Sequence, residues 1–290
     1  MPMKNILFQG ACTALVTPFR NGKVNYSMLE QLIIRQQEAR IPAMVLCGTT
    51  GEAPTLSDTE KLKIFACGKK CGGNCTIICG TGSNDTHHAI ALSRAAEDAG
   101  ADALLVVSPY YNKSTEQGLI DHYSAIAAAV HIPIILYNVP SRTGLDMPVS
   151  VYKTLSQIPN IAGVKEASTD ITKIIKIRLH CPEDFCIWSG NDDMTVPVMS
   201  LGGMGVISVV SNVAPLEVQD MCLAALAGDF DTAAALQCEL MPLTAALFSE
   251  VNPIPVKAAM SLIGYDCGSC RPPLSCASAK CISQLNALLT

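Results

Sequence analysis

The amino-acid sequence predicts a (β/α)8 barrel, the TIM barrel, followed by a helical extension. Eight short apolar runs alternate with helical patterns, and successive runs begin 20 to 33 residues apart. Polar residues follow most of the runs, as expected where strands end at the catalytic face of such a barrel. A barrel of this kind typically has about 250 residues, and the chain has 290.

The apolar runs are the predicted strands, because each is short and is followed by glycine, proline or polar residues. They are Cys12–Val16, Ala43–Cys47, Thr76–Cys79, Ala103–Val107, Ile132–Tyr137, Ile161–Lys165, Phe185–Ser189 and Gly205–Val209. A doubly wound open sheet is the alternative. It would normally need fewer strands and a glycine-rich first turn, and GTTGE at 48–52 has neither G-x-G-x-x-G spacing nor a P-loop lysine.

Several helices between the runs have recognisable start signals. Three serines are followed three residues later by Glu or Gln, the spacing of a capping box. These pairs are Ser27 with Glu30, Ser57 with Glu60, and Ser114 with Gln117. We expect Asp85 to cap the helix that ends near Gly100, and Pro215 to occupy a first helical position.

After about Gly228 the strand patterns stop. Helices are expected over Ala233–Leu247 and Pro255–Ile263, followed by a link rich in Gly, Pro and Cys and a short final helix. We therefore divide the chain into a barrel over 1–228 and a helical region over 229–290. The apolar faces of that region must be covered by the barrel or by another subunit.

Composition excludes several classes of partner. Apolar residues make up 49% and charged residues 16% of the chain, and the net charge of −5 comes without a Lys/Arg block. This balance argues against nucleic-acid binding. The apolar stretch Ala125–Leu136 contains His131 and Pro133 and is too short to span a membrane. Because residues 1–19 lack a long apolar signal core, we expect a cytoplasmic protein.

Fourteen cysteines are many for a cytosolic chain. Two groups stand out: Cys67, Cys71, Cys75 and Cys79, and Cys267, Cys270, Cys276 and Cys281. Metal or iron–sulfur sites favour paired C-x-x-C spacing. Only Cys267 and Cys270 have it, and no matching pair follows. We interpret the cysteines as buried thiols that pack as small hydrophobes in a reducing cell.

Lys165 is the most informative single residue, because it is a cation in the otherwise apolar stretch IAGVK that reads as a buried strand. Burial disfavours the charged form of a lysine, so the neutral amine becomes available to attack a ketone and form a Schiff base. The alternative is a structural ion pair with Glu166 or another carboxylate.

The predicted strand ends bring hydroxyls, glycines and few charges to one face. These residues include Thr13, Thr17, Thr49, Thr50, Tyr110, Tyr111, Tyr137, Arg142, Lys165, Gly190 and Ser208. The set suits a small, oxygen-rich substrate, with Arg142 able to clamp a carboxylate. Each has a structural alternative: Tyr110 and Tyr111 as interface packing, the threonines as caps, and Arg142 as a brace of its own loop. Their concentration on one face favours function.

Other ligand classes have weaker support. Gly202 and Gly203 precede the eighth run instead of following it, so a phosphate site is weakly supported. No His, Asp and Glu set indicates a metal site. The five histidines are interpreted as surface or packing residues: His87, His88, His122, His131 and His180.

Six motifs together resemble the dihydrodipicolinate synthase family of lysine biosynthesis, also called 4-hydroxy-tetrahydrodipicolinate synthases. They are GTTGE at 48–52, SPYYNK at 108–113, YNVPSRTG at 137–144, GVKEAS at 163–168, SGND at 189–192 and NPIPVKAA at 252–259. The resemblance runs from about Gly10 to RPPL at 271–274. GTTGE and the barrel lysine belong to the wider pyruvate-dependent class I aldolase superfamily, which includes N-acetylneuraminate lyase. SPYYNK and YNVPSRTG are more specific.

The resemblance implies a lyase that condenses pyruvate with L-aspartate 4-semialdehyde, the entry step of diaminopimelate and lysine biosynthesis. Lys165 would form the Schiff base. Tyr137 would relay protons with Thr49 and with Tyr111 of a neighbouring subunit. The implied substrate-binding residues are Thr50 for the pyruvate carboxylate, Arg142 for the semialdehyde, and Gly190 and the Ile207 carbonyl in the pyruvate pocket. No external cofactor or metal would be required, and a homotetramer, a dimer of dimers, is expected.

One departure from the family pattern concerns feedback inhibition. Lysine-inhibited members place an Asn and a Glu one helical turn apart after the third strand, and a His pair after GTTGE. Here Asn84 is present, but His88 replaces the Glu, and Asp58 and Lys61 replace the histidines. We therefore expect lysine inhibition to be weak or absent.

Two other functions fit part of the pattern. A pyruvate lyase or dehydratase for sugar acids would share Lys165 but would not need Arg142. A barrel that binds a keto acid only as a sensor would form no borohydride-trappable adduct.

Overall fold

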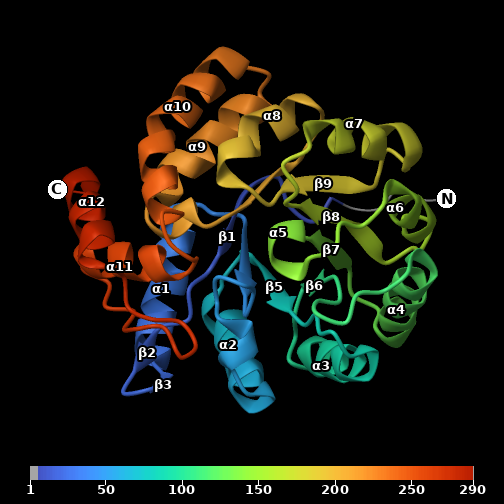
Figure 1. Cartoon of the computed structure of the whole chain (residues 1–290), viewed down its shortest axis with the longest axis horizontal. Helices are drawn as coiled ribbons and strands as arrows, with labels where there is room; N and C mark the ends of the chain where they lie inside the picture. The colour runs from blue at the N-terminus through green and yellow to red at the C-terminus, as the bar shows by residue number, and fades with distance from the viewer. Residues whose placement is uncertain (1–5, 290) are drawn as a thin grey trace.

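The computed structural model describes residues 6–289 and contains a closed barrel of eight parallel strands in the order β1-β10-β9-β8-β7-β6-β5-β4 (Figure 1). The strands are β1 (Gly10–Ala14), β4 (Ala43–Leu46), β5 (Thr76–Gly80), β6 (Ala103–Val107), β7 (Ile134–Asn138), β8 (Ile161–Glu166), β9 (Cys186–Ser189) and β10 (Gly205–Ser208). All eight predicted runs are strands, so the predicted fold class is confirmed and the open sheet is wrong. The expectation of a cytoplasmic protein was drawn from residues 1–19, and residues 1–5 of these lie outside the described part.

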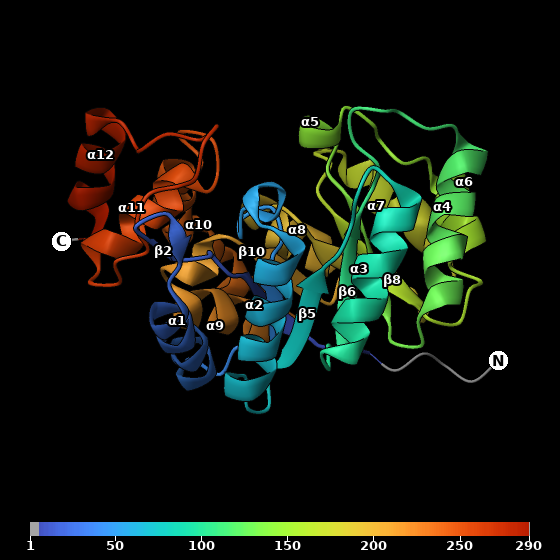
Figure 2. The ribbon, with the colours of Figure 1, turned by 90° about the horizontal axis from the view of Figure 1, so that it is seen from below.

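Helices follow the strands and form the outer layer (Figures 1 and 2). They are α1 (Tyr26–Glu38), α2 (Asp58–Cys71), α3 (Thr86–Asp98), α4 (Glu116–Ala129), α5 (Pro140–Thr143), α6 (Val149–Leu155), α7 (Ile171–His180), α8 (Thr195–Ser200) and α9 (Pro215–Leu226). Short 3₁₀ segments lie at Ala53–Thr55, Asp192–Met194 and Val210–Asn212. No helix in residues 6–289 is long and apolar enough to cross a membrane.

The helix starts agree with the sequence in three of five cases. Ser57 and Glu60 form the predicted capping box, Asp85 caps α3, and α9 begins at Pro215. The other two predictions are wrong by one or two residues. The cap of α1 is Asn25, not Ser27, and the cap of α4 is Thr115, not Ser114. Residues one or two positions apart in each segment can cap equally well, so the capping pattern alone did not fix the first residue.

An antiparallel hairpin of β2 (Phe19–Arg20) and β3 (Lys23–Val24) was not predicted. Its two turn residues have positive φ, 52° for Asn21 and 73° for Gly22, which is the backbone of a type I′ turn and a common use of Asn-Gly. The hairpin contacts the Gly-, Pro- and Cys-rich link of the C-terminal region: the Phe19 amide donates a hydrogen bond to the Cys267 carbonyl at 2.9 Å.

Alternating strand residues separate two apolar layers. Leu136 and Val164 pack outward against the helices, whereas Tyr137 and Ile207 belong to a cluster inside the barrel. Near the start of β1 this interior is filled by Phe8 and Trp188, whose rings stack with centroids 4.8 Å apart. The interior is therefore a packed core, and chemistry is confined to the opposite end, where strands lead into helices.

Residues 229–290 contain α10 (Phe230–Leu247), α11 (Ile254–Leu262) and α12 (Ala279–Leu289). In Figures 1 and 2, α10 lies against α8 and α9, and α11 and α12 lie beside it. Leu247, Val256 and Leu285 belong to the same apolar cluster as the outer layer of the barrel. Of the two covers expected for this region, the barrel or another subunit, the barrel covers these residues. The division from the barrel at residue 228 stays a prediction.

Candidate active site

Lys165 is held inside the barrel by the register of two neighbouring strands. It pairs with Tyr137 across β7 and β8, and its Nζ lies 4.4 Å from the centre of the Tyr137 ring. The side chain is buried, with 5% of the residue exposed. Because Val164 packs outward and side chains alternate along a strand, Lys165 points inward.

Glu166 is not the partner of Lys165. It lies on the opposite face of β8, where its carboxylate accepts hydrogen bonds from Asn138 Nδ2, the Tyr152 hydroxyl and the Ser168 amide, each at 2.8 Å. The proposed structural ion pair between Lys165 and Glu166 is therefore wrong. The alternation of the strand explains why, since residues adjacent in sequence face opposite sides.

The remaining buried lysines are all paired with carboxylates. Lys61 Nζ lies 3.5 Å from Asp58, Lys257 Nζ lies 2.9 Å from Glu52, and Lys173 contacts Asp146. Among the buried lysines of residues 6–289, only Lys165 has no carboxylate within ion-pair distance. A buried amine without a paired carboxylate lowers the stability of the folded protein. A group that is unfavourable for folding in this way is typical of a functional site.

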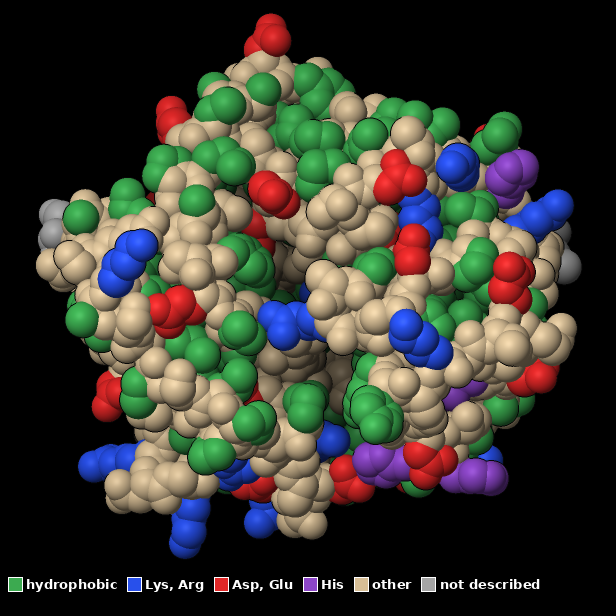
Figure 3. Space-filling model, in the orientation of Figure 1, with side chains coloured by type: hydrophobic (Ala, Val, Ile, Leu, Met, Phe, Trp, Pro, Cys, Tyr) green, Lys and Arg blue, Asp and Glu red, His purple; other side chains and the backbone are tan. Residues whose placement is uncertain are grey.

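A cavity of about 630 Å³ opens beside this lysine, and Figure 3 shows a hollow near the centre of the face in view, bordered by basic side chains. Thr49, Tyr110, Tyr137 and Arg142 line it. Lys165 does not line this cavity, but Tyr137, whose ring its amine overlies, does. The structure thus brings four of the predicted residues to one space next to Lys165.

Thr50 and Glu52 of GTTGE are fixed by the C-terminal region. The Thr50 hydroxyl is buried and accepts a hydrogen bond from Asn252 Nδ2 at 3.0 Å. Glu52 has left-handed backbone geometry, φ 56°, and forms the buried pair with Lys257. The loop that contains the threonines is therefore rigidly placed, and neither of them caps the 3₁₀ segment that follows.

Arg142 reaches out of its own loop. It lies on the short helix α5, and its Nη2 donates to the carbonyl oxygen of Asn252 at 3.2 Å. The interpretation of Arg142 as a brace of its own loop is therefore not supported. The guanidinium keeps several donors for a ligand at the cavity it lines.

Gly190 and Ile207 lie at the ends of β9 and β10. A Cβ at Gly190 would come within 2.6 Å of the Ala167 Cβ, so this position requires glycine. Beside Ile207, Asp192 accepts from the Ser208 hydroxyl, and from the Val209 amide at 2.9 Å. Burial raises the pKa of the Asp192 carboxyl, and these bonds and the charge of Lys165 oppose that rise.

Tyr111 lies apart from the other candidates. It is 94% exposed and has left-handed backbone geometry with φ 68°, which is unusual for an aromatic residue. Its neighbour Tyr110 lines the cavity instead. A tyrosine projected in this way is available to another subunit, and it does not reach the cavity of its own chain.

A polar cluster forms part of the cavity wall. Asp58, Lys61 and His88 line it, and Asp58 contacts His88 Nε2 at 2.9 Å and Lys61 Nζ at 3.5 Å. The hydrogen bond from His88 lowers the pKa of Asp58. His88 is therefore part of a cavity wall, which corrects its interpretation as a surface or packing residue.

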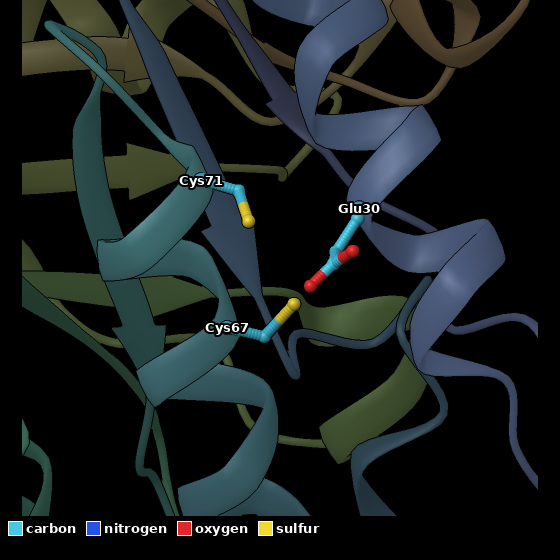
Figure 4. A group of neighbouring side chains, drawn as sticks. All are labelled: Glu30, Cys67 and Cys71. Atoms are coloured by element: carbon cyan, nitrogen blue, oxygen red, sulfur yellow. The ribbon is translucent and has the colours of Figure 1, made fainter.

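The cysteines form no disulfide in the described chain. Cys67 and Cys71 lie one turn apart on α2 and face Glu30 of α1 (Figure 4), with one potential ligand atom from each within 4.8 Å of the others. Structural zinc sites have four ligands, and this group offers three, one of which lies 3.6 Å from Lys70. Packing of these thiols as small hydrophobes stays our prediction.

Two residues that contact this site were missed. Asn252, which contacts both Thr50 and Arg142, was quoted only as part of NPIPVKAA. Asp192, which hydrogen-bonds the Val209 amide beside Ile207, was expected at the strand ends as part of SGND but was given no role. Asn252 lies just before a helix in the C-terminal region, and no local sequence pattern places such a residue at the barrel mouth. Only the motif NPIPVKAA could have pointed to it.

Comparisons with known proteins agree with this geometry. The family model described as the Dihydrodipicolinate synthetase family matches residues 7–290. A 4-hydroxy-tetrahydrodipicolinate synthase of Thermoanaerobacter pseudethanolicus is 47% identical over 98% of this chain and 96% of its own.

Solved structures give the same result. Dihydrodipicolinate synthase from Thermotoga maritima superposes with a TM-score of 0.96 at 39% identity, covering 98% of each chain. The enzyme from Cyanidioschyzon merolae with lysine bound gives a TM-score of 0.95 at 38% identity, covering 99% of this chain and 100% of that one.

Proposed function

This chain belongs to the dihydrodipicolinate synthetase family, and we propose that Lys165 carries the reaction of that family in its barrel. The enzyme is a lyase of the class I aldolase type. It condenses pyruvate with L-aspartate 4-semialdehyde to give 4-hydroxy-tetrahydrodipicolinate, the entry step of diaminopimelate and lysine biosynthesis. The observation that supports the role of Lys165 is its position as a buried lysine without a carboxylate partner.

The amine of Lys165 attacks the ketone of pyruvate, and one water leaves as the imine forms. Loss of a proton from the pyruvate methyl group gives an enamine, which attacks the aldehyde carbon of the second substrate. The amino group of that substrate then attacks the imine carbon, closes the ring and releases Lys165. One water is lost overall, and every proton can be moved by side chains, so the reaction needs no external cofactor.

Tyr137 is the proposed proton relay. Its ring lies beside Lys165 Nζ, and Tyr137 and Thr49 line the same cavity. Tyr111 would complete this relay in the site of a neighbouring subunit, which its 94% exposure supports. A chain of hydroxyl groups can pass a proton from one to the next, so no side chain of the buried site has to hold a net charge.

The remaining candidates are proposed to bind substrate. Thr50 donates to the pyruvate carboxylate, and Gly190 and the Ile207 carbonyl border the pyruvate. Arg142, at the cavity, clamps the carboxylate of the semialdehyde. Its position beside the cavity, free of any carboxylate partner within residues 6–289, supports this role.

The proposed assembly is a homotetramer, a dimer of dimers, in the cytoplasm, without nucleic-acid or membrane partners. If Tyr111 serves the neighbouring site, a dimer is the smallest active unit. The exposed, left-handed Tyr111 supports an assembly in which this side chain is buried by another copy of the chain.

The experiment that tests this function combines two assays on Arg142→Gln and the unchanged protein. A coupled assay with aspartate semialdehyde follows condensation, and borohydride reduction follows imine formation with pyruvate. We expect Arg142→Gln to lower kcat/KM for the semialdehyde by roughly 100-fold, since a charge-assisted bidentate pair is lost, and to leave imine formation nearly unchanged. Equal losses in both assays, or turnover of sugar acids by the unchanged protein, would favour a different pyruvate lyase.

A further inference from the structure

We propose that Asn252 is a positioning residue that sets the two groups holding the two substrates. The proposal rests on the substrate roles given above to Thr50 and Arg142. Asn252 is 6% exposed and lies just before α11, about 200 residues along the chain from Thr50. Its side chain contacts Thr50, and its main chain contacts Arg142.

The direction of the first contact matters for catalysis. Asn252 Nδ2 donates to Thr50 Oγ1 at 3.0 Å. A hydroxyl has one proton to donate. Because Thr50 accepts from Asn252, its own proton is free for the pyruvate carboxylate, and the amide fixes the direction in which that proton points.

The second contact holds Arg142 by the main chain. The carbonyl oxygen of Asn252 accepts from Arg142 Nη2 at 3.2 Å. One residue thus links the group proposed for pyruvate to the group proposed for the semialdehyde, and a shift of Asn252 would move both. A substitution of the side chain would release Thr50 and leave the contact with Arg142 in place.

The side chain of Asn252 does not contribute its full hydrogen-bonding capacity to the stability of the fold. Its Oδ1 is buried and receives no hydrogen bond from any described group. An unsatisfied buried acceptor lowers stability, and an apolar residue of the same shape would remove that cost. Retention of an amide here is explained by what its Nδ2 does for Thr50.

Asn252 is itself held rigidly. Lys257, one turn into α11, forms the buried pair with Glu52 at 2.9 Å and also donates to the Ser269 carbonyl. The Arg271 amide donates to the second oxygen of Glu52 at 2.8 Å. The C-terminal region therefore clamps the GTTGE loop, and we treat it as part of the active site.

The test compares Asn252→Leu, Thr50→Val and the double variant with the unchanged protein. Asn252→Leu should raise the KM for pyruvate roughly tenfold, the equivalent of one lost hydrogen bond. It should leave the KM for the semialdehyde within about twofold and the melting temperature unchanged or higher. The double variant should be no worse for pyruvate than Thr50→Val alone, because both changes remove the same interaction.

Asn252→Asp provides a second measurement. Its carboxylate would accept a hydrogen bond from the Thr50 hydroxyl, which turns that donor away from pyruvate, and would repel the pyruvate carboxylate. Its pyruvate KM should therefore exceed that of Asn252→Leu. Asn160→Leu is the matched control. Asn160 donates to the Ala127 and Val130 carbonyls, where the chain enters β8, so its loss should lower the melting temperature and leave the pyruvate KM unchanged.

The proposal would be overturned by an unchanged pyruvate KM in Asn252→Leu, or by additive effects in the double variant. A fall in melting temperature that accompanies equal losses for both substrates would also overturn it, because it would show a structural role. If instead the unchanged protein fails to condense the two substrates, the proposed function fails, and this result is distinct from a failure of Asn252 alone.

Discussion

The amine of Lys165 lies 4.4 Å from the centre of the Tyr137 ring, and the two residues are register partners on β8 and β7. Parallel pairing places both side chains on the inner face of the barrel. The proposed nucleophile and the proposed proton relay are therefore positioned by the same strand pair, and no loop has to close to bring them together.

Tyr137→Phe should separate the two functions of this pair. The phenyl ring keeps its packing beside Lys165, but the hydroxyl is lost. We expect kcat to fall by about 10²–10⁴, the usual contribution of a general acid–base group, while borohydride still traps pyruvate on the protein. Steady-state kinetics and the mass of the trapped adduct provide the measurement. Near-normal turnover of this variant would show that another group relays the proton.

Tyr111 should act across a subunit interface. Because it is 94% exposed, Tyr111→Phe should lower activity without lowering the melting temperature. Mixing Tyr111→Phe with Lys165→Ala should restore activity, since a heterodimer contains one site with an intact lysine and an intact neighbouring tyrosine. Activity is measured after the two variant proteins are dissociated and reassociated together, and is compared with that of each variant alone. No recovery on mixing, with heterodimers demonstrated by mass, would contradict a shared site.

Lysine inhibition is predicted to be weak or absent. At the wall of the cavity, Asp58 binds both His88 and Lys61, so a ligand ammonium would meet the charge of Lys61 there. Titration of activity with lysine into the millimolar range should leave most of the activity. Strong partial inhibition at these concentrations would refute the prediction.

His122 should make stability depend on pH. Burial lowers the pKa of His122 to about 4 from an ordinary value of 6.5, so the unfolded chain binds a proton that the folded chain does not. The free energy of unfolding should therefore decrease as pH falls from 6.5 towards 4, by about 2 kcal/mol between pH 7 and pH 5. Urea denaturation at these two pH values measures the difference.

His122→Gln should remove much of this pH dependence, whereas His87→Gln, at an exposed position, should retain it. Equal pH dependence in all three proteins would contradict the assignment to His122.

The sequence predicted the barrel because its strands are short apolar runs whose period and spacing are local properties. The partners that a side chain finds on other elements could not be predicted from the sequence. Lys165 and Glu166 are adjacent in sequence, yet the strand separates them to opposite faces and gives Glu166 to Asn138 and Tyr152.

Local competition explains the errors at helix starts, where Asn25 caps α1 in place of Ser27. Asn252 illustrates the larger limit. Its contacts with Thr50 and Arg142 depend on how the C-terminal region packs on the barrel, and nothing local in NPIPVKAA indicates it.

The most direct test of the account is peptide mass mapping after incubation with pyruvate and borohydride. Lys173 and Lys257 are buried lysines paired with carboxylates and are internal controls. We predict that the reduced pyruvate adduct is found on Lys165 alone, and that Lys165→Ala forms no adduct and loses turnover. An adduct on another lysine, or full turnover by Lys165→Ala, would contradict the account.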